Sequence, residues 1–325
     1  MAETAPPIPE RPGRLVGPAN LLRELWQDKP GFVGFVLMVL LLLMAIFAPL
    51  IAPFDPAEQS LRARLVPPVW QDGGSWPYIL GTDHLGRDML SRVIHGARIS
   101  IFVGVSVVLV AGSFGVALGL VAGFFGGRID SAIMRLVDTL VAFPGLLLAL
   151  VILAVIGPSM WAVILVLALT NWMVFARMSR SIVLSVRQLP YVEAAEVAGG
   201  RPGHVIFRHV LPNLTSPLLT LGVLEFANVV LAEAALSFLG LGIQPPATSW
   251  GLDVANGKDY LFVAWWLVTI PGLAIATTVL AINLVASWAR TTSDPQEREK
   301  RFALTVAAQA RRRARRRKPP LEPAE

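Results

Sequence analysis

The sequence predicts an all-α polytopic membrane protein with six transmembrane helices. Hydrophobic residues make up 54% of its 325 residues and charged residues only 15%, whereas soluble domains usually carry about 25% charged residues. The mean hydropathy is +0.62. Uncharged stretches that reach the roughly 20 residues a helix needs to cross the hydrocarbon core recur along the chain.

The spans follow from these uncharged stretches. Residues 139–176 are 38 uncharged residues in a row, too many for one span, and Gly157-Pro158 supplies the break between two helices. The predicted spans are residues 31–54, 99–127, the two halves of 139–176, 212–241 and 260–289. Around them lie an N-terminal arm (1–30), an outer loop (55–98), a five-helix core (99–289) and a basic tail (290–325).

The Lys and Arg distribution predicts the orientation. With six spans both termini share a side, and outside the tail 11 basic residues fall on that side against 6 on the other. Cytoplasmic loops collect Lys and Arg, so we expect both termini and the loop at 177–212 to be cytoplasmic.

The second half of the outer loop is patterned as a helix that feeds the second span. One predicted face is apolar and consists of Leu85, Met89, Leu90, Val93, Ile94 and Ala97. The other is polar and consists of His84, Arg87, Asp88, Ser91, Arg92, His95 and Arg98. Two interpretations stay open: an amphipathic helix at the membrane interface, or a connecting helix packed on the outer protein surface.

Two further patterns concern helix packing and shape. Ala111, Gly115, Gly119 and Gly123 recur at four-residue spacing in the second span, which lets another helix approach closely. Pro144-Gly145 and Pro271-Gly272 lie inside the third and sixth spans, where each proline removes a backbone hydrogen bond and should bend its helix.

The loop at 177–212 predicts a helical elbow outside the membrane. Pro190 suits a first helical turn, Glu193 favours the positive end of the helix, and Gly199 suits a left-handed helix end. A second short helix begins near Pro202. Ala194 and Ala195 give the first helix a nearly smooth surface that a partner groove can accept.

At these residues the sequence resembles the loop of ABC importer permeases, whose pattern is Glu-Ala-Ala, three residues, Gly, nine residues, Ile, one residue, Leu-Pro. The matching positions are Glu193, Ala194, Ala195, Gly199, Leu211 and Pro212. His209 stands where the pattern has Ile. The resemblance implies that this loop couples the chain to an ATPase.

Further motifs resemble the C-type permease subunit of the dipeptide/oligopeptide/nickel group. They are Gly81-Thr82-Asp83-His84-Leu85-Gly86-Arg87-Asp88, the run from Ala232 to Gly242, Pro245-Pro246, and Ser249-Trp250-Gly251. The resemblance covers about residues 30 to 290. It implies a type I ABC importer permease fold in a bacterial plasma membrane, and dipeptides, oligopeptides, nickel complexes or glutathione-like molecules as cargo.

The resemblance also implies the partners. They are a homologous B-type permease as the other half of the pore, two cytoplasmic ABC ATPase subunits that bind ATP and Mg²⁺, and an extracytoplasmic substrate-binding protein. The chain itself carries no P-loop: Gly257-Lys258-Asp259 lacks the Ser/Thr and the first Gly at the required spacing. We therefore expect no enzymatic activity, no catalytic residue and no cofactor in this chain.

Acidic residues within the spans are the remaining candidates. We expect Asp138 to pair with Arg135, one turn earlier. Glu225, Asn228 and Glu233 are candidates to line the pore, and hydrogen bonding inside the helix bundle is the alternative for the two glutamates. A second class of function, a secondary carrier driven by an ion gradient, would use Glu225 or Glu233 as its coupling carboxylate. A third class is a membrane scaffold that transports nothing.

Several site types are not indicated. The chain has no cysteine, and its four histidines show no metal-ligand spacing. The run from Arg311 to Lys318 favours a tail that meets anionic lipid or supports the topology, and not nucleic-acid binding.

Overall fold

The computed structural model describes residues 25–26 and 28–293, and this part is helical, without a β-strand. The α-helices are α2 (Lys29–Ile46), α3 (Ala48–Ile51), α4 (Met89–Phe125), α5 (Gly127–Val141), α6 (Gly145–Ile156), α7 (Met160–Arg187), α8 (Pro190–Val197), α9 (Pro202–Val205), α10 (Leu211–Phe238), α11 (Trp250–Gly257) and α12 (Trp266–Ser293). The interpretations of residues 1–24 and of the Arg-rich tail lie outside the described residues.

Five segments of the described part are long and apolar enough to cross a membrane, and α5 with α6 makes a sixth if the two are counted as one bent span. The expected break at Gly157-Pro158 is confirmed, since α6 ends at Ile156 and α7 begins at Met160. The third span differs from the expectation in shape: α5 and α6 meet at 83°.

Pro144 is the reason for this bend. A proline lacks the amide hydrogen and disfavours the helical conformation of the residue before it. The helix therefore ends at Val141 and restarts at Gly145, where a mere kink was expected. Pro271 has a weaker effect, because α12 continues through it.

Helix α4 joins the expected outer helix and the second span in 37 continuous residues. It begins at Met89, because the Asp88 carboxylate caps it by accepting a 2.8 Å hydrogen bond from the Ser91 amide. The interpretation as an interfacial helix is wrong, since the side chains of Ser91 and Arg92 are buried inside the protein. The polar face of this helix packs against other protein segments.

The stripe of small residues on α4 contacts α7, as expected. A Cβ atom added to Gly115 would lie 2.2 Å from the Trp172 carbonyl oxygen, and one added to Gly119 would lie 2.5 Å from the Ala176 carbonyl oxygen. Only glycine permits this backbone approach. The two helices thereby form the centre of the main hydrophobic core, to which α6 and α10 also contribute.

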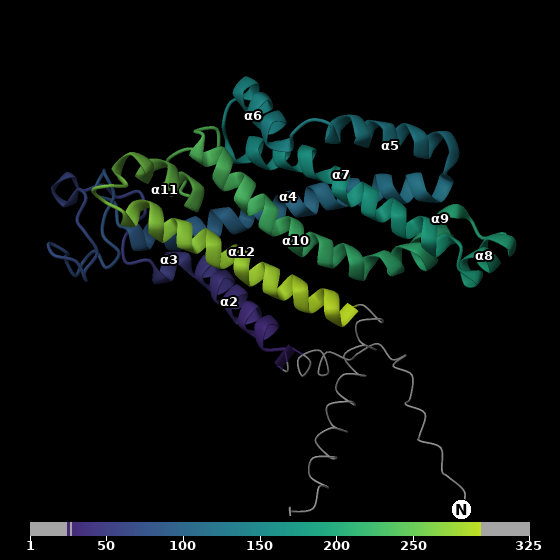
Figure 1. The fold of residues 1–325 in the computed structure, drawn as a ribbon, viewed down its shortest axis with the longest axis horizontal. Helices are drawn as coiled ribbons and strands as arrows, with labels where there is room; N and C mark the ends of the chain where they lie inside the picture. Colours follow the sequence, from purple (N-terminus) through teal and green to yellow (C-terminus); the bar gives the residue numbers. More distant parts are fainter. Residues whose placement is uncertain (1–24, 27, 294–325) are drawn as a thin grey trace, which may run out of the picture.

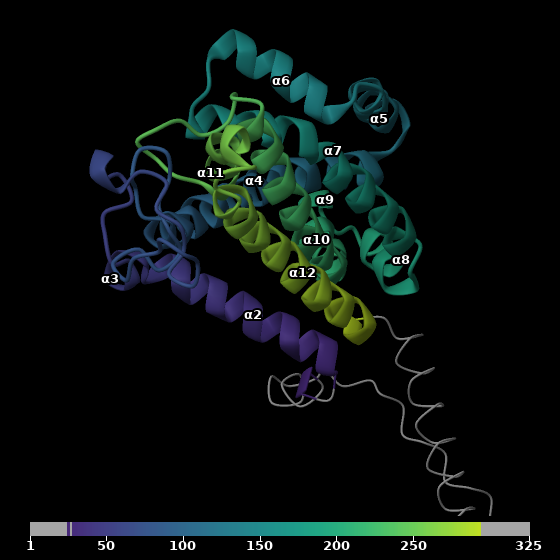
Figure 2. The same ribbon diagram turned by 60° about the vertical axis from the view of Figure 1, so that its left-hand side comes forward.

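The helices pack in layers across the molecule. In Figure 2, α5 and α6 lie on one side of the molecule and α2 lies on the opposite side, with α4, α7, α10 and α12 between them. Along the helices, α8 lies at one end and α11 at the other (Figure 1). The start of α2 and the end of α12 point toward the α8 end, so both described chain ends share a side with α8 (Figure 2).

Candidate functional site: the elbow between α7 and α10

The elbow, defined here as residues 188–210, begins with the predicted helix. Helix α8 starts at Pro190 and carries Glu193 in its first turn. Gly199 adopts a φ of +81°, and the amide of Gly200 donates to the Ala195 carbonyl at 3.0 Å. This is the left-handed helix end that the sequence predicts, and it turns the chain back toward Pro202.

The predicted coupling residues lie mainly on the outer surface of the elbow. Glu193, Ala194, Gly199 and Pro212 are exposed, while Ala195 and Leu211 are half-buried. Large apolar side chains extend this surface: Val197 is 88% and Phe207 70% exposed. The exposed surface thus combines apolar side chains with the Glu193 carboxylate and with Arg201 and Arg208. Exposed apolar side chains of this kind are typical of a contact surface for another protein.

The inner surface of the elbow is packed on the transmembrane helices. Val192, Val205 and Val210 are fully buried. They form a cluster with Leu120 and Phe124 of α4, Val183 and Val186 of α7, and Leu214 of α10. The elbow is therefore attached to three spans through a continuous apolar core.

Arg187 adds a polar connection that the sequence did not reveal. Its Nη1 donates to the Phe124 carbonyl at 2.6 Å, its Nε lies 3.2 Å from Glu196 Oε1, and its guanidinium lies 5.2 Å from the centre of the Phe124 ring. The Phe124 carbonyl is one of the last in α4, where a helix leaves its acceptors unpaired and attracts cations. Arg187 thus connects α8 to the end of α4.

His209, the departure from the permease pattern, lies in a π-helical turn at Ile206–Val210. The Leu211 amide donates to the Ile206 carbonyl across this turn. Such a wide turn suits the position, because Pro212 follows it and has no amide hydrogen for a regular helical bond. Asn213 donates to the His209 carbonyl at 2.6 Å and to the Tyr191 hydroxyl at 3.0 Å, which connects α8 to α10.

The candidate pore residues do not form one wall. Glu233 is 1% exposed and accepts hydrogen bonds from Ser237 and Ser249, both at 2.8 Å. This arrangement favours the alternative, hydrogen bonding inside the helix bundle, over a pore role for Glu233. Glu225 is buried, with Asn228 Nδ2 at 3.5 Å, and of the three side chains only that of Asn228 is exposed.

Asp138 does not pair with Arg135. Its Oδ1 accepts from Arg177 Nη2 at 2.7 Å, across to α7. A second pair joins the same two helices, since Asp130 accepts from the Arg180 Nε at 2.5 Å and from its Nη2 at 2.6 Å. The local spacing suggested a partner one turn away, whereas the tertiary packing offers arginines on the neighbouring helix.

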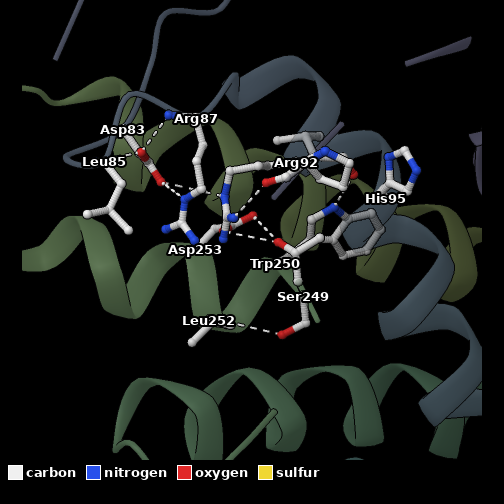
Figure 3. A network of polar contacts seen from close by, with 12 residues as sticks. Asp83, Leu85, Arg87, Arg92, His95, Ser249, Trp250, Leu252 and Asp253 are labelled. Atoms are coloured by element: carbon white, nitrogen blue, oxygen red, sulfur yellow. Dashed lines mark hydrogen bonds and ion pairs between the residues drawn. The ribbon is translucent and has the colours of Figure 1, made fainter. Parts of the chain in front are cut away.

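At the opposite end of the molecule, two sequence motifs meet in a buried polar cluster (Figure 3). Arg92 of α4 donates through Nε to Asp253 of α11 at 2.8 Å, and Asp83 binds the Arg87 Nε at 2.6 Å. Arg92 Nε also lies 3.8 Å from Asp83. All four side chains are at most 9% exposed. This cluster joins the outer loop to α4 and α11.

Trp250 completes the junction. Its ring nitrogen donates to the Val93 carbonyl at 2.9 Å, and its side chain is fully buried. The next residue, Gly251, packs so closely on α10 that an added Cβ would lie 2.5 Å from the Ala234 Cα. The runs at 81–88 and 249–251 therefore have a structural role at the end of the molecule opposite the elbow.

Two family models match this chain. Residues 115–299 match the family described as binding-protein-dependent transport system inner membrane component. Residues 19–68 match the N-terminal TM domain of oligopeptide transport permease C.

Individual relatives cover nearly the whole chain. The di/tripeptide transport system permease protein DppC of Pseudomonas aeruginosa is 43% identical over 279 residues, which is 85% of this chain and 92% of that protein. The dipeptide transport system permease protein DppC of Escherichia coli K12 is 45% identical over 283 residues, 86% of this chain and 94% of that protein. The dipeptide transport system permease protein DppC of Haemophilus influenzae is 39% identical over 283 residues, which is 86% of this chain and 96% of that protein.

Proposed function

Because the chain belongs to the family of binding-protein-dependent transport system inner membrane components, we propose that it carries short peptides and receives its driving force at the elbow. It is a multi-pass permease subunit of an ABC importer. The peptide cargo is proposed from its relatives, which are named for dipeptide or di/tripeptide transport.

The partners that we propose complete this importer. A homologous B-type permease supplies the other half of the path, and an extracytoplasmic binding protein delivers the peptide. Two ABC ATPase subunits bind ATP and Mg²⁺. These ATPases are expected to contact the exposed surface of α8, where Glu193 and Ala194 lie beside Val197.

The attachment of the elbow is the observation that carries this proposal. Its exposed surface is available to a partner, while Val192 and Val205 are buried against α4 and α7, and Arg187 holds the end of α4. A displacement of α8 is therefore transmitted to the spans as a rigid-body movement. This is how closure of two ATPases would switch the path from inward to outward access.

The orientation is part of the proposal. The elbow lies at the same end as the start of α2 and the end of α12 (Figure 2). Arg177, Arg180 and Arg187 also follow one another toward this end of α7. We infer that the elbow and both termini are cytoplasmic, because basic residues gather on that side of a membrane protein.

A secondary carrier is not favoured. Its coupling carboxylate would have to be accessible and change its protonation during transport. Glu233 is instead enclosed by Ser100, Ser237 and Ser249, and Glu225 is 8% exposed. Together with the family membership, this burial favours a structural role for both groups.

Gly199→Val tests the elbow. A valine at a φ of +81° is strained, at a cost of about 1–3 kcal/mol, and we expect it to displace α8 and uncouple ATP hydrolysis from peptide uptake. The matched control is Gly203→Val: both glycines have open space around them, but the left-handed φ occurs only at Gly199 of the two. Uptake and ATPase rates would be measured on the reconstituted complex.

Glu193→Lys tests the same surface without a backbone change. Reversing this exposed charge should reduce uptake per ATP hydrolysed while membrane insertion stays intact, since Glu193 makes part of the contact surface and not of the packed core. Wild-type coupling in both Gly199→Val and Glu193→Lys would contradict the proposed role of the elbow. A complex in which the ATPase never contacts α8 would contradict it as well.

A further inference from the structure

The α5–α6 bend, defined here as residues 141–147, is open to its surroundings. All seven of its residues are exposed, and none of them has a polar side chain. Phe143 is 57% and Leu147 58% exposed. In Figure 2, α5 and α6 lie on the side of the molecule opposite α2. The described part of the chain therefore leaves the bend uncovered.

The bend lies deep in the membrane. A Cβ atom added to Gly145 would lie 3.9 Å from the Thr170 Cβ of α7, so these two residues are at the same depth. Thr170 follows Met160, the first residue of α7, by ten positions, which is about 15 Å along the helix. Trp161, next to Met160, is 62% exposed, and exposed tryptophans are typical of a membrane surface. Because the hydrocarbon core is roughly 30 Å thick, the bend lies near its middle.

The bend leaves backbone amides without an acceptor in their own helix. The first regular bond of α6 runs from the Leu148 amide to the Pro144 carbonyl at 3.0 Å, so the amides of Gly145, Leu146 and Leu147 precede it. Pro144 is the N-cap of α6, and no side chain of the described residues caps this helix start. Irregular backbone at membrane depth is stable only where protein covers it or where it lines a water-filled cavity. Lipid is therefore excluded as the surroundings of the bend.

Protein suits the exposed side chains of the bend better than water does. Val141, Phe143 and Leu147 together form an exposed apolar surface, and such surfaces mark contacts with other proteins. A partner at this depth must itself be embedded in the membrane. The ATPases and the binding protein proposed above lie in water on either side of it, so the partner permease is the candidate that remains.

We propose that the partner permease packs against the α5–α6 bend and supplies hydrogen-bond acceptors to the amides of Gly145, Leu146 and Leu147. The contact would cover the apolar side chains and the backbone amides together. The identity of the partner, a B-type permease, rests on the proposed function. The requirement for a protein cover follows from the depth and the backbone of the bend alone.

Photo-crosslinking in membranes that contain the assembled importer tests this contact. The photoreactive residue p-benzoylphenylalanine replaces Phe143, whose aromatic ring it retains. On illumination we expect a covalent product of this chain with the B-type permease, identified by mass spectrometry. The matched control carries the same residue in place of Leu40, which is 56% exposed on α2. It should give none of this product, because α2 is an unbroken helix whose exposed side chains between residues 32 and 46 are all apolar, as lipid requires.

The outcomes separate this contact from the proposed function. An importer that contains the B-type permease but gives no crosslink to it from position 143 would overturn the contact. A product that joins two copies of this chain would overturn it as well. If the purified wild-type importer contained no B-type permease, the partner named here would be refuted together with the proposed function. Crosslinking needs no transport, so a wrong cargo would leave the result unchanged.

A bulky substitution gives a second test. Leu147→Trp and Leu40→Trp place the same ring at positions of nearly equal exposure, 58% and 56%. Fluid lipid accommodates either ring, whereas a packed protein contact does not. We expect Leu147→Trp to lower the amount of B-type permease that copurifies with this chain by about tenfold. Leu40→Trp should leave it unchanged, with equal amounts of both variants in the membrane. Equal recovery of the B-type permease with the two variants would overturn the proposal.

Discussion

Replacing Gly115 with alanine is expected to destabilise the protein by about 3 kcal/mol, although it adds a single methyl group. The new Cβ atom would lie 2.2 Å from the Trp172 carbonyl oxygen and 2.8 Å from the Phe175 Cβ. The first of these is a backbone atom, so no side-chain rotation relieves the clash. The whole contact between α4 and α7 must open, and this contact is the centre of the core.

Thermal unfolding of the subunit in detergent measures this effect. A change of this size lowers the midpoint by about 5 °C in a chain of this length. Gly112→Ala is the matched control: it lies one turn earlier on α4, and its new Cβ would be 3.6 Å from the Phe175 ring, an ordinary contact. Equal midpoints for the two variants would show that the close approach of α4 and α7 is not required.

Arg92→Met is expected to cost about 3–5 kcal/mol, because it leaves the buried Asp253 carboxylate without its cation. Both side chains of this pair are only 2% exposed. Methionine retains much of the length and apolar stem of arginine, so the loss reports on charge and hydrogen bonding. The outer loop should detach from α4 and α11, since Arg92 Nη1 also donates to the Pro56 carbonyl at 3.2 Å.

Two further variants test whether the unpaired Asp253 carboxylate causes the loss of stability. Arg98→Met removes an exposed arginine from the same helix and should change the unfolding midpoint little. Arg92→Met combined with Asp253→Leu should recover most of the loss, since it removes the unpaired carboxylate. If the double variant does not regain stability, the packing of the Arg92 side chain, and not its charge, holds the cluster together.

The pH dependence of Arg92→Met gives a further check. Burial raises the pKa of the Asp253 carboxyl, while Arg92 opposes this effect. Without Arg92 the folded-state pKa should rise further above the unfolded value. At low pH the Asp253 carboxyl of the variant is neutral and its burial costs little. As the pH rises through the folded-state pKa, the carboxyl must ionise without its cation, and the folded protein loses stability. The difference in unfolding free energy between wild type and Arg92→Met should therefore be smaller at about pH 5 than at about pH 8.

The elbow shows how far the residues alone determine a site. Pro190 and Gly199 begin and end α8 as expected, because proline fixes the first turn and glycine tolerates the left-handed end. These are local effects that act within one or two turns of the chain. Arg187 escaped prediction because its partner, the Phe124 carbonyl, lies 63 residues away.

The outer helix shows where periodicity misleads. The polar residues between His84 and Arg98 were expected to face solvent or the membrane interface, or to lie on the outer protein surface. Arg92 is instead buried, because Asp253 of α11 supplies the opposite charge. A sequence pattern separates polar from apolar faces, but it does not show which distant segment covers a polar face.

The sequence by itself determined the helical class, the apolar spans, the break at Gly157-Pro158 and the glycine stripe of α4, because these follow from hydrophobicity, proline and residue size along a short stretch of chain. The tertiary structure decided the partners of the charged groups: Arg177 for Asp138, Asp253 for Arg92, and a cluster of serines for Glu233. Such pairings depend on which helices pack together, because the partners come from segments that are far apart in the sequence.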